Sequence, residues 1–196
     1  MKETAKKLFT AYVGESQARN RYTFFSKVAK KEGYGLISTI FLETANQEKE
    51  HGSWFYKMLQ VVKKEEHFDE MKVLPEADFP TTHGTTVENL KSAIAGENME
   101  WQTLYPDIAE TADKEKYPNI AKRVQAIMVA EKHHSERYGK LLKLVDDYAF
   151  FKRGNKIVWV CMECGYEVEV DQLPQGFVCP SCSQPRAYYR KKCEEF

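Results

Sequence analysis

The sequence predicts a mainly α-helical protein, a four-helix bundle with a long connection between its second and third helices, followed by a small β-rich module. Three observations support this class. No proline occurs before Pro75, and the residues before it are rich in Ala, Lys, Glu, Phe and Leu. From residue 157 the pattern changes to short alternating stretches between Gly and Pro turns. All five histidines precede residue 135 and all five cysteines follow residue 160, which suggests two separate ligand chemistries.

The first two helices are predicted over residues 3–31 and 36–64, and Gly33 and Gly35 separate them. Each would be about 40 Å long at 1.5 Å per residue. Residues 65–85 mix charged residues with prolines and a glycine, and they predict a long connection. That connection can return within the same chain or cross to a second copy, in which case two chains would exchange helices.

The third helix is expected to begin near Thr86, whose hydroxyl can cap it. It should run to about Lys114 and be kinked at Pro106. A bundle with one long connection in its middle is the ferritin-like variant of the four-helix bundle.

After a short break, Pro118 suits the first turn of the fourth helix, which should run to about Tyr148. The predicted organisation is therefore a bundle over 1–148, a linker over 149–156 and the β-rich module over 157–196.

The composition excludes some classes of partner. The 196 residues suffice for one large domain and a small one. Because 29 Lys and Arg residues balance 29 Asp and Glu residues, no basic surface for nucleic acid or membranes is expected. No run approaches the about 18 apolar residues of a membrane span. The first residues lack the apolar core of a signal peptide, so we expect a cytoplasmic protein with reduced cysteines.

Each predicted helix has an apolar stripe at helical spacing, and acidic residues interrupt all four stripes near the middle. On the third helix the stripe continues through Leu104 and Ile108. A single such glutamate is explained as a boundary residue that reaches water. Five in one core would each be costly without nearby cations, so the shared height favours a metal site. The five are Glu15, Glu48, Glu97, Glu100 and Glu131.

Two Glu-x-x-His motifs, Glu48 to His51 and Glu131 to His134, each place a carboxylate and an imidazole on one helical face. With a glutamate from each of the other helices, they form the pattern of di-iron or di-manganese carboxylate proteins. Such oxygen-rich sites favour iron or manganese over tetrahedral zinc. His133 remains an alternative to its neighbour as ligand. The other two histidines, His67 and His83, are expected in solvent.

The two halves of the bundle repeat one another. Glu15 and Glu48 are 33 residues apart, and Glu97 and Glu131 are 34 apart, which suggests a duplicated helical hairpin. Glu100 breaks the symmetry because its counterpart is Ala18. We therefore expect an additional, asymmetric ligand.

Two C-x-x-C motifs separated by 14 residues predict a tetrahedral tetrathiolate site. A zinc ribbon and a rubredoxin-type iron site are both compatible with this spacing. Gly165 can take a positive φ and let amides approach sulfur. Cys193 has no partner motif and is expected as a free thiol. The four predicted ligands are Cys161, Cys164, Cys179 and Cys182.

Taken together, these motifs resemble those of the rubrerythrin family, in the same order over nearly the whole chain. They are Gly14-Glu-Ser-Gln-Ala-Arg-Asn-Arg-Tyr22, Glu48-x-x-His51, Gly96-Glu97-x-x-Glu100, Glu131-x-x-His134 and the two cysteine motifs. The resemblance implies a non-haem di-iron peroxidase with a C-terminal rubredoxin-like domain. It also implies a homodimer in which the Fe(Cys)4 site of one chain faces the di-iron site of the other. Ser183 departs from the glycine usual there, so a positive φ would be mildly strained.

The resemblance further implies roles for the site residues. Four glutamates would hold two irons, with two of them bridging, and one histidine would bind one iron. A histidine and a fifth glutamate would exchange on the other iron as its redox state changes, and two tyrosines would donate hydrogen bonds to ligand carboxylates. The four iron-holding glutamates would be Glu15, Glu48, Glu97 and Glu131, and Glu48 and Glu131 would bridge. His134 would bind the first iron, and His51 and Glu100 would exchange on the second. Tyr22 and Tyr105 would be the hydrogen-bond donors.

We therefore expect reduction of hydrogen peroxide to water, with electrons relayed through the rubredoxin-like iron. No Gly-x-Gly-x-x-Gly motif is present. A separate, NAD(P)H-linked reductase or a rubredoxin-type protein would therefore supply the electrons. One alternative is a ferroxidase or iron-handling ferritin-like protein, and another is a zinc-ribbon interaction protein. Zinc can replace iron at these ligands in a purified sample.

Overall fold

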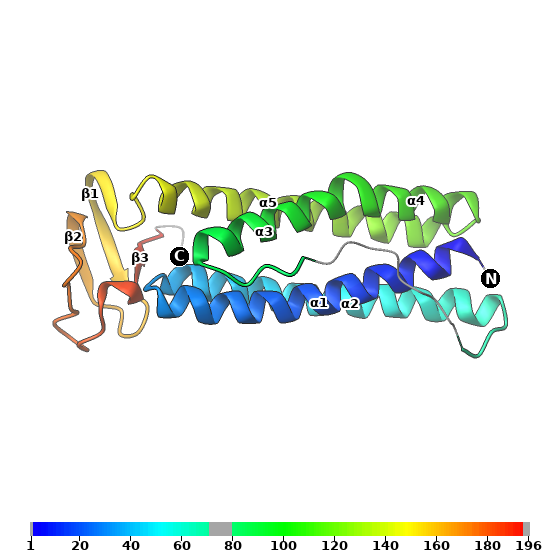
Figure 1. Ribbon diagram of the computed structural model, residues 1–196, viewed down its shortest axis with the longest axis horizontal. Coiled ribbons are helices and arrows are strands. Elements are labelled where there is room, and N and C mark those ends of the chain that lie inside the picture. Colours follow the sequence, from blue (N-terminus) through cyan, green and yellow to red (C-terminus); the bar gives the residue numbers. More distant parts are fainter. Residues whose placement is uncertain (1, 71–79, 194–196) are drawn as a thin grey trace.

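The computed structural model describes residues 2–70 and 80–193, so the middle of the predicted connection 65–85 lies outside the described residues. The chain forms an elongated helical bundle with the small β-rich module at one end, opposite the N-terminus (Figure 1). This arrangement confirms the predicted mainly helical class. The bundle consists of α1 (Glu3–Lys31), α2 (Gly35–Glu65), α3 (Thr86–Met99), a π-helical turn η1 (Glu100–Leu104), α4 (Tyr105–Lys114) and α5 (Pro118–Asp146).

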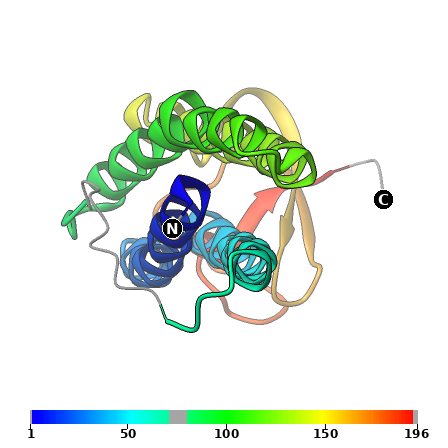
Figure 2. The ribbon, with the colours of Figure 1, turned by 90° about the vertical axis from the view of Figure 1, so that its right-hand side faces the viewer.

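The helices form two antiparallel pairs. Helices α1 and α2 make one pair, and α3, η1 and α4 pack along α5 to make the other (Figures 1 and 2). A tight turn joins α1 to α2, and Gly33 adopts φ 87° there, a value that glycine tolerates without a Cβ clash. Helix α5 ends at Asp146, two residues before the predicted end at Tyr148, which takes φ 53°.

The cap of α3 is Thr85 and not the predicted Thr86. The Thr85 hydroxyl accepts the Glu88 amide at 3.3 Å, and the Glu88 carboxylate accepts the Thr85 amide at 2.8 Å. This reciprocal pair is a capping box. Thr86 is fully buried as the first helical residue, so its hydroxyl is in no position to cap.

The irregularity expected at Pro106 is the π-helical turn that directly precedes it. The Tyr105 amide donates to the Glu100 carbonyl, a bond five residues back instead of four. The extra residue changes which side chains face the core. Leu104, predicted there, is only half-buried, and Tyr105 is fully buried in its place.

The β-rich module is a three-stranded antiparallel sheet with the order β2-β1-β3. Its strands are β1 (Lys152–Cys161), β2 (Glu167–Gln172) and β3 (Tyr189–Lys191), with a short 3-10 turn η2 (Arg186–Tyr188) before the last. Strand β1 begins inside the predicted linker 149–156, because Lys152 already pairs with Gln172. Phe150 and Phe151 in the same stretch are buried against Tyr34, so the segment is packed.

The bundle core consists of two apolar clusters. One surrounds Phe55 and Tyr105 near the N-terminal end, and the other runs from Tyr22 and Phe41 into the module, where it includes Trp159. All four helical stretches pass from one cluster to the other, and each carries a buried glutamate at the crossing. The acidic residues therefore form a layer between two apolar regions.

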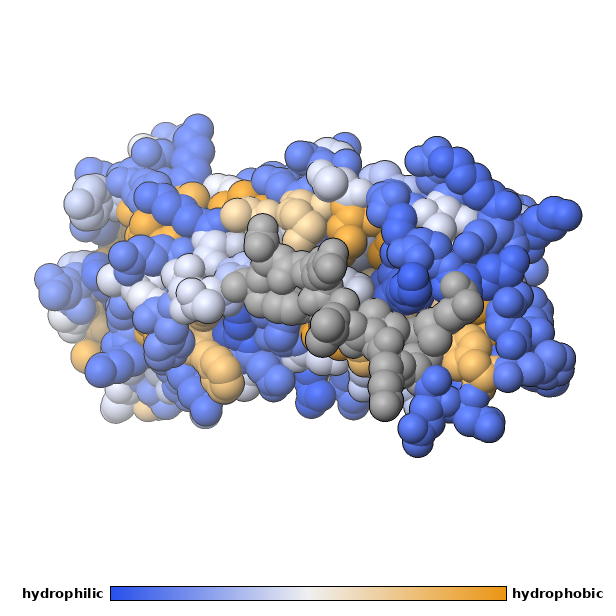
Figure 3. Space-filling view, turned by 45° about the vertical axis from the view of Figure 1, so that its right-hand side comes forward, coloured by the Kyte–Doolittle hydropathy of each residue, from blue (hydrophilic) through white to orange (hydrophobic). Residues whose placement is uncertain are grey.

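The surface is mainly hydrophilic on the face seen in Figure 3, where hydrophobic residues appear in small groups between charged ones. Within residues 2–70 and 80–193, no helix combines the length and apolar character needed to cross a membrane.

The module is seated on the bundle through a close backbone contact at the start of α2. A Cβ added to Gly35 would overlap the carbonyl oxygen of Ala187 in η2 and come within 3.5 Å of Met162. On the other side of this junction, Arg186 lies over the ring of Phe151 at 4.5 Å. Glycine at position 35 thus lets the helix end touch the module directly.

Replacing Gly35 with alanine should weaken this seating, because a backbone carbonyl must shift to admit the methyl group. We expect a loss of about 1–3 kcal/mol in the free energy of unfolding, measured by thermal or denaturant unfolding. Gly139→Ala in α5 is the matched control, since no atom lies within 4 Å of a Cβ there and its φ is not positive. Equal stability of the two variants would contradict the contact.

Candidate metal centres

Six of the predicted ligands meet in the middle of the bundle, and they come from four helices. They form two groups in which one ligand atom per residue lies within 4.8 Å of all the others. Two glutamates of the Glu-x-x-His motifs belong to both groups. The first group consists of Glu15, Glu48, His51 and Glu131, and the second consists of Glu48, Glu97, Glu131 and His134.

Each of the two shared glutamates, Glu48 and Glu131, directs one oxygen to His51 and the other to His134. Glu131 Oε1 is 2.7 Å from His51 Nδ1, and Glu131 Oε2 is 2.8 Å from His134 Nδ1. Glu48 Oε2 is 2.9 Å from His51 Nδ1, and Glu48 Oε1 is 3.2 Å from His134 Nδ1. The two imidazole rings are 5.9 Å apart between centroids. This geometry provides two positions for cations, joined by two carboxylates.

Several of these atoms are buried without a hydrogen-bond partner among the described residues, although they lie close together. They are Glu15 Oε2, Glu48 Oε1, Glu97 Oε2, both oxygens of Glu131 and His134 Nδ1. Unpaired buried carboxylate oxygens are costly, and a bound cation removes that cost. The donor set of carboxylate oxygens and imidazole nitrogens therefore fits two divalent ions such as iron or manganese.

The electrostatics of this acidic layer lead to the same conclusion. Burial and neighbouring carboxylates raise the pKa of Glu97 to about 8 and that of Glu15 well above its usual range. For Glu131, burial raises the pKa, but close contacts with the imidazoles of His134 and His51 outweigh this effect and lower the pKa to about 2. Although burial disfavours a charged imidazole, contacts with Glu131 and Glu48 raise the pKa of His51 to about 10. The protein alone thus does not balance the charges, and the layer attracts cations.

Two buried tyrosines each donate a hydrogen bond to one oxygen of an unshared glutamate. Tyr22 donates to Glu97 Oε1 at 2.5 Å, and Tyr105 donates to Glu15 Oε1 at 2.5 Å. Burial and nearby carboxylates raise the pKa of both phenols well above the usual value, so both remain donors. The second oxygen of each glutamate is left without a hydrogen bond and available for a metal.

Glu100 lies beside this layer but belongs to neither group. It is 7% exposed and begins the π-helical turn. Burial, and next the charge of Glu97, raise its pKa well above the usual range, while the charge of Arg21 opposes that shift. Helical periodicity predicted the position of Glu100, whereas Arg21 lies within the Gly14–Tyr22 motif without a predicted role.

The remaining histidines lie outside the site. His133 is exposed on α5 while His134 is buried, so the structure brings only the second of the two neighbours to the layer. His67 and His83 are exposed.

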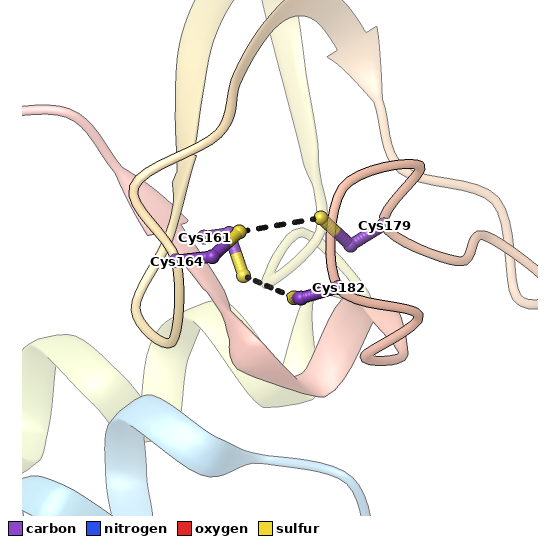
Figure 4. A group of neighbouring side chains, drawn as sticks. All are labelled: Cys161, Cys164, Cys179 and Cys182. Atoms are coloured by element: carbon purple, nitrogen blue, oxygen red, sulfur yellow. Dashed lines mark hydrogen bonds between the residues drawn. The ribbon is translucent and has the colours of Figure 1, made fainter.

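The four predicted cysteines also meet, where the loop over 161–164 faces the loop over 179–182 (Figure 4). Cys161 Sγ is 3.7 Å from Cys182 Sγ, and Cys164 Sγ is 3.6 Å from Cys179 Sγ. A tetrahedral site with metal–sulfur bonds of about 2.3 Å has sulfur–sulfur edges of about 3.8 Å. The sulfurs are therefore spaced for one metal ion and too far apart for disulfides.

The two loops that carry the cysteines are alike. Gly165 and Ser183 take φ values of 77° and 60°, and their amides donate to the carbonyls of Cys161 and Cys179, respectively. The positive φ expected at Ser183 is thus present, although a side chain makes that conformation less favourable than for glycine. Cys193 is exposed and is not part of this group.

Comparisons with known proteins agree with both centres. The family model described as rubrerythrin matches residues 6–142, and that of the rubrerythrin rubredoxin-like domain matches residues 159–190. Rubrerythrin-1 of Clostridium acetobutylicum is 44% identical over 99% of this chain and 96% of its own length. A rubrerythrin of Porphyromonas gingivalis is 45% identical over 95% of this chain and 88% of its own.

Solved structures show similarity of the whole chain. The structure titled as the fully reduced, all-ferrous state of nigerythrin matches with a TM-score of 0.62 and 25% identity, over 98% of this chain and 88% of that one. A bacterioferritin of Mycobacterium tuberculosis, at 16% identity and a TM-score of 0.61, shares the fold of the bundle.

Glu131→Ala should remove two of three bound metal ions per chain, because Glu131 contributes to both groups of the bundle. Metal analysis of the purified protein measures this number, and the absorption of the tetrathiolate site should be unchanged. Glu136→Ala is the matched control, since Glu136 is exposed on the same helix. A full metal complement in Glu131→Ala would show that this carboxylate holds no metal.

Proposed function

The chain belongs to the rubrerythrin family of oxidoreductases, and from this premise we propose that it is a non-haem di-iron peroxidase that reduces hydrogen peroxide to water. Two irons would lie in the bundle and a third between the cysteines. The observation that carries the proposal is the presence of both centres in one chain. A ferroxidase or an iron store needs no tetrathiolate relay, and a zinc-ribbon scaffold leaves the buried carboxylates without a purpose.

The geometry of the bundle site supports the proposed ligand roles. Glu48 and Glu131 would bridge the two metal positions, because each directs one oxygen to either side. Glu15 would hold the ion on the His51 side and Glu97 the ion on the His134 side. Tyr105 and Tyr22 each hold one oxygen of these carboxylates by a hydrogen bond, which orients them and leaves the other oxygen free to bind a metal.

When bound, two ferrous ions would supply two electrons and Lewis acidity at one point. With two protons from solvent, this suits cleavage of the O–O bond to two waters without a one-electron product. Protein side chains enclose the proposed metal positions on most sides. Side chains of both apolar clusters flank the acidic layer, so few competing water molecules reach it. On the metal of the His51 side, we propose that His51 and Glu100 exchange as ligands with the redox state.

The tetrathiolate site would deliver electrons one at a time, and so twice per turnover. Gly35 touches the module, and Glu48 follows it by 13 residues on the same helix. At 1.5 Å per residue the acidic layer lies about 20 Å along α2 from this contact, and the cysteine site lies in the module beyond it. A homodimer that places the module of one chain against the bundle of the other would shorten the transfer, and we propose this arrangement, with or without exchanged helices.

Electrons must reach the tetrathiolate site from another protein, because the sequence contains no Gly-x-Gly-x-x-Gly motif. We propose a separate NAD(P)H-linked reductase or a rubredoxin-type carrier as donor. Free thiols gathered as a ligand set suit a reducing compartment, which supports a cytoplasmic site of action.

Stopped-flow mixing tests the reaction itself. The diferrous protein should be reoxidised far faster by hydrogen peroxide than by dioxygen at equal concentration. Faster reaction with dioxygen, together with formation of iron mineral, would favour a ferroxidase instead.

Cys164→Ser tests the relay separately from the chemistry. A single reoxidation of the chemically reduced variant by peroxide should proceed as in the unaltered protein, because the bundle is untouched. Steady turnover with NAD(P)H and a reductase should fall by at least tenfold. Cys193→Ser is the control and should keep both rates, since Cys193 lies outside the ligand set.

A further inference from the structure

Arg21 is a buried cation that the functions described so far leave without a purpose. It lies on α1, two turns after Glu15, with only 9% of its surface exposed. Its Nε donates to Gln17 at 2.6 Å, but its Nη1 is buried and has no hydrogen-bond partner within the described residues. A buried guanidinium with an unused donor is unfavourable unless a partner is available part of the time.

The other end of the guanidinium lies against α3. Nη2 is 3.5 Å from the position of a Cβ on Gly96, so a side chain larger than a methyl group would occupy this space. The rings of Tyr22 and Phe25 lie 5.6 Å and 6.0 Å from the guanidinium carbon. The cation is therefore held in place by aromatic rings and by the absence of a side chain at position 96.

Glu100 is a buried carboxyl group on the helical stretch that the guanidinium approaches. It follows Gly96 by four residues, which is about one turn or 6 Å along the helix. Side chains on a helix lean toward its N-terminus, which directs Glu100 toward the turn that contains Gly96. The charge of Arg21 already acts on Glu100 in this structure. The guanidinium of Arg21 and the carboxyl group of Glu100 are thus neighbours across the α1–α3 contact, and Glu100 would gain a buried cationic partner when it is ionised.

We propose that Arg21 is a positioning residue for Glu100: its guanidinium receives the Glu100 carboxylate whenever that side chain is off the metal. This inference rests on the proposed exchange of Glu100 and His51. An anionic carboxylate binds an oxidised, more highly charged metal better than a neutral imidazole does, so Glu100 is free in the reduced protein. Arg21 then stabilises the reduced state by pairing with the freed carboxylate.

The first test is a double-mutant cycle on the iron-loaded, reduced protein, with Arg21→Gln, Glu100→Gln and the two together. Removing one member of a buried pair is costly, and removing both is much less so. Arg21→Gln should lower the unfolding midpoint by about 6–20 °C. The double variant with Glu100→Gln should recover most of the lost unfolding midpoint. Arg19→Gln is the control, because Arg19 is exposed on the same helix and should leave the midpoint unchanged.

Failure of Arg21→Gln to fold is also informative. If the double variant then folds, the defect is the unpaired Glu100 carboxylate, as proposed. If the double variant is as unstable as Arg21→Gln, Arg21 serves packing alone and the proposal is wrong. A midpoint for Arg21→Gln equal to that of Arg19→Gln would overturn it as well.

The midpoint potential of the di-iron centre provides a readout that packing alone does not change. Arg21→Gln should lower the potential, because the reduced state loses its support, and Arg21→Lys should lower it less. In the Glu100→Gln background the same change should have no effect. An equal shift in both backgrounds would mean that Arg21 acts on the metals directly, which contradicts the proposal. Neither readout uses peroxide turnover, so the role of Arg21 is tested independently of the peroxidase activity.

Discussion

Burial of five carboxylates at one level of a helical bundle is the constraint on which the rest of the structure depends. Each of the four helical stretches contributes a glutamate where it passes between the two apolar clusters, and α3 with its π-helical turn contributes a second. Repulsion and burial raise the pKa of Glu15, Glu97 and Glu100, so the protein alone disfavours their charged forms. Cations between the carboxylates reverse this balance. The fold therefore places a costly anionic layer where two metal ions can compensate it.

Several local features serve this layer. Tyrosines on α1 and α4 each hold one oxygen of Glu97 and Glu15, which orients these carboxylates and leaves their second oxygens without a hydrogen bond. The π-helical turn allows Glu100 and Tyr105 to face the core together, although they are five residues apart. The close contact at Gly35 seats the tetrathiolate module on the end of the same bundle. In the proposed function, that module supplies electrons to the acidic layer of a second copy.

The sequence predicted the features that depend on regular patterns. Helical periodicity located the long helices and the buried glutamates, and the spacing of the cysteines predicted the four-thiol group. Irregular backbone was not predictable in the same way. A strict helical period placed Leu104 in the core, whereas the extra residue of the π turn places Tyr105 there. Strand β1 begins at Lys152 because of long-range pairing with Gln172, which no local pattern encodes. No role for Arg21 was predictable, because Gly96, which its guanidinium approaches, lies 75 residues away on another helix.

Anomalous X-ray diffraction at the iron absorption edge, from crystals of the iron-loaded protein, tests the central claim most directly. Two strong peaks should appear in the bundle, one beside His51 and one beside His134, with Glu48 and Glu131 between them. A third peak should lie among the four cysteine sulfurs. A single peak at the cysteines, with the glutamates protonated and hydrogen-bonded to one another, would contradict the claim that the acidic layer exists to hold two metal ions.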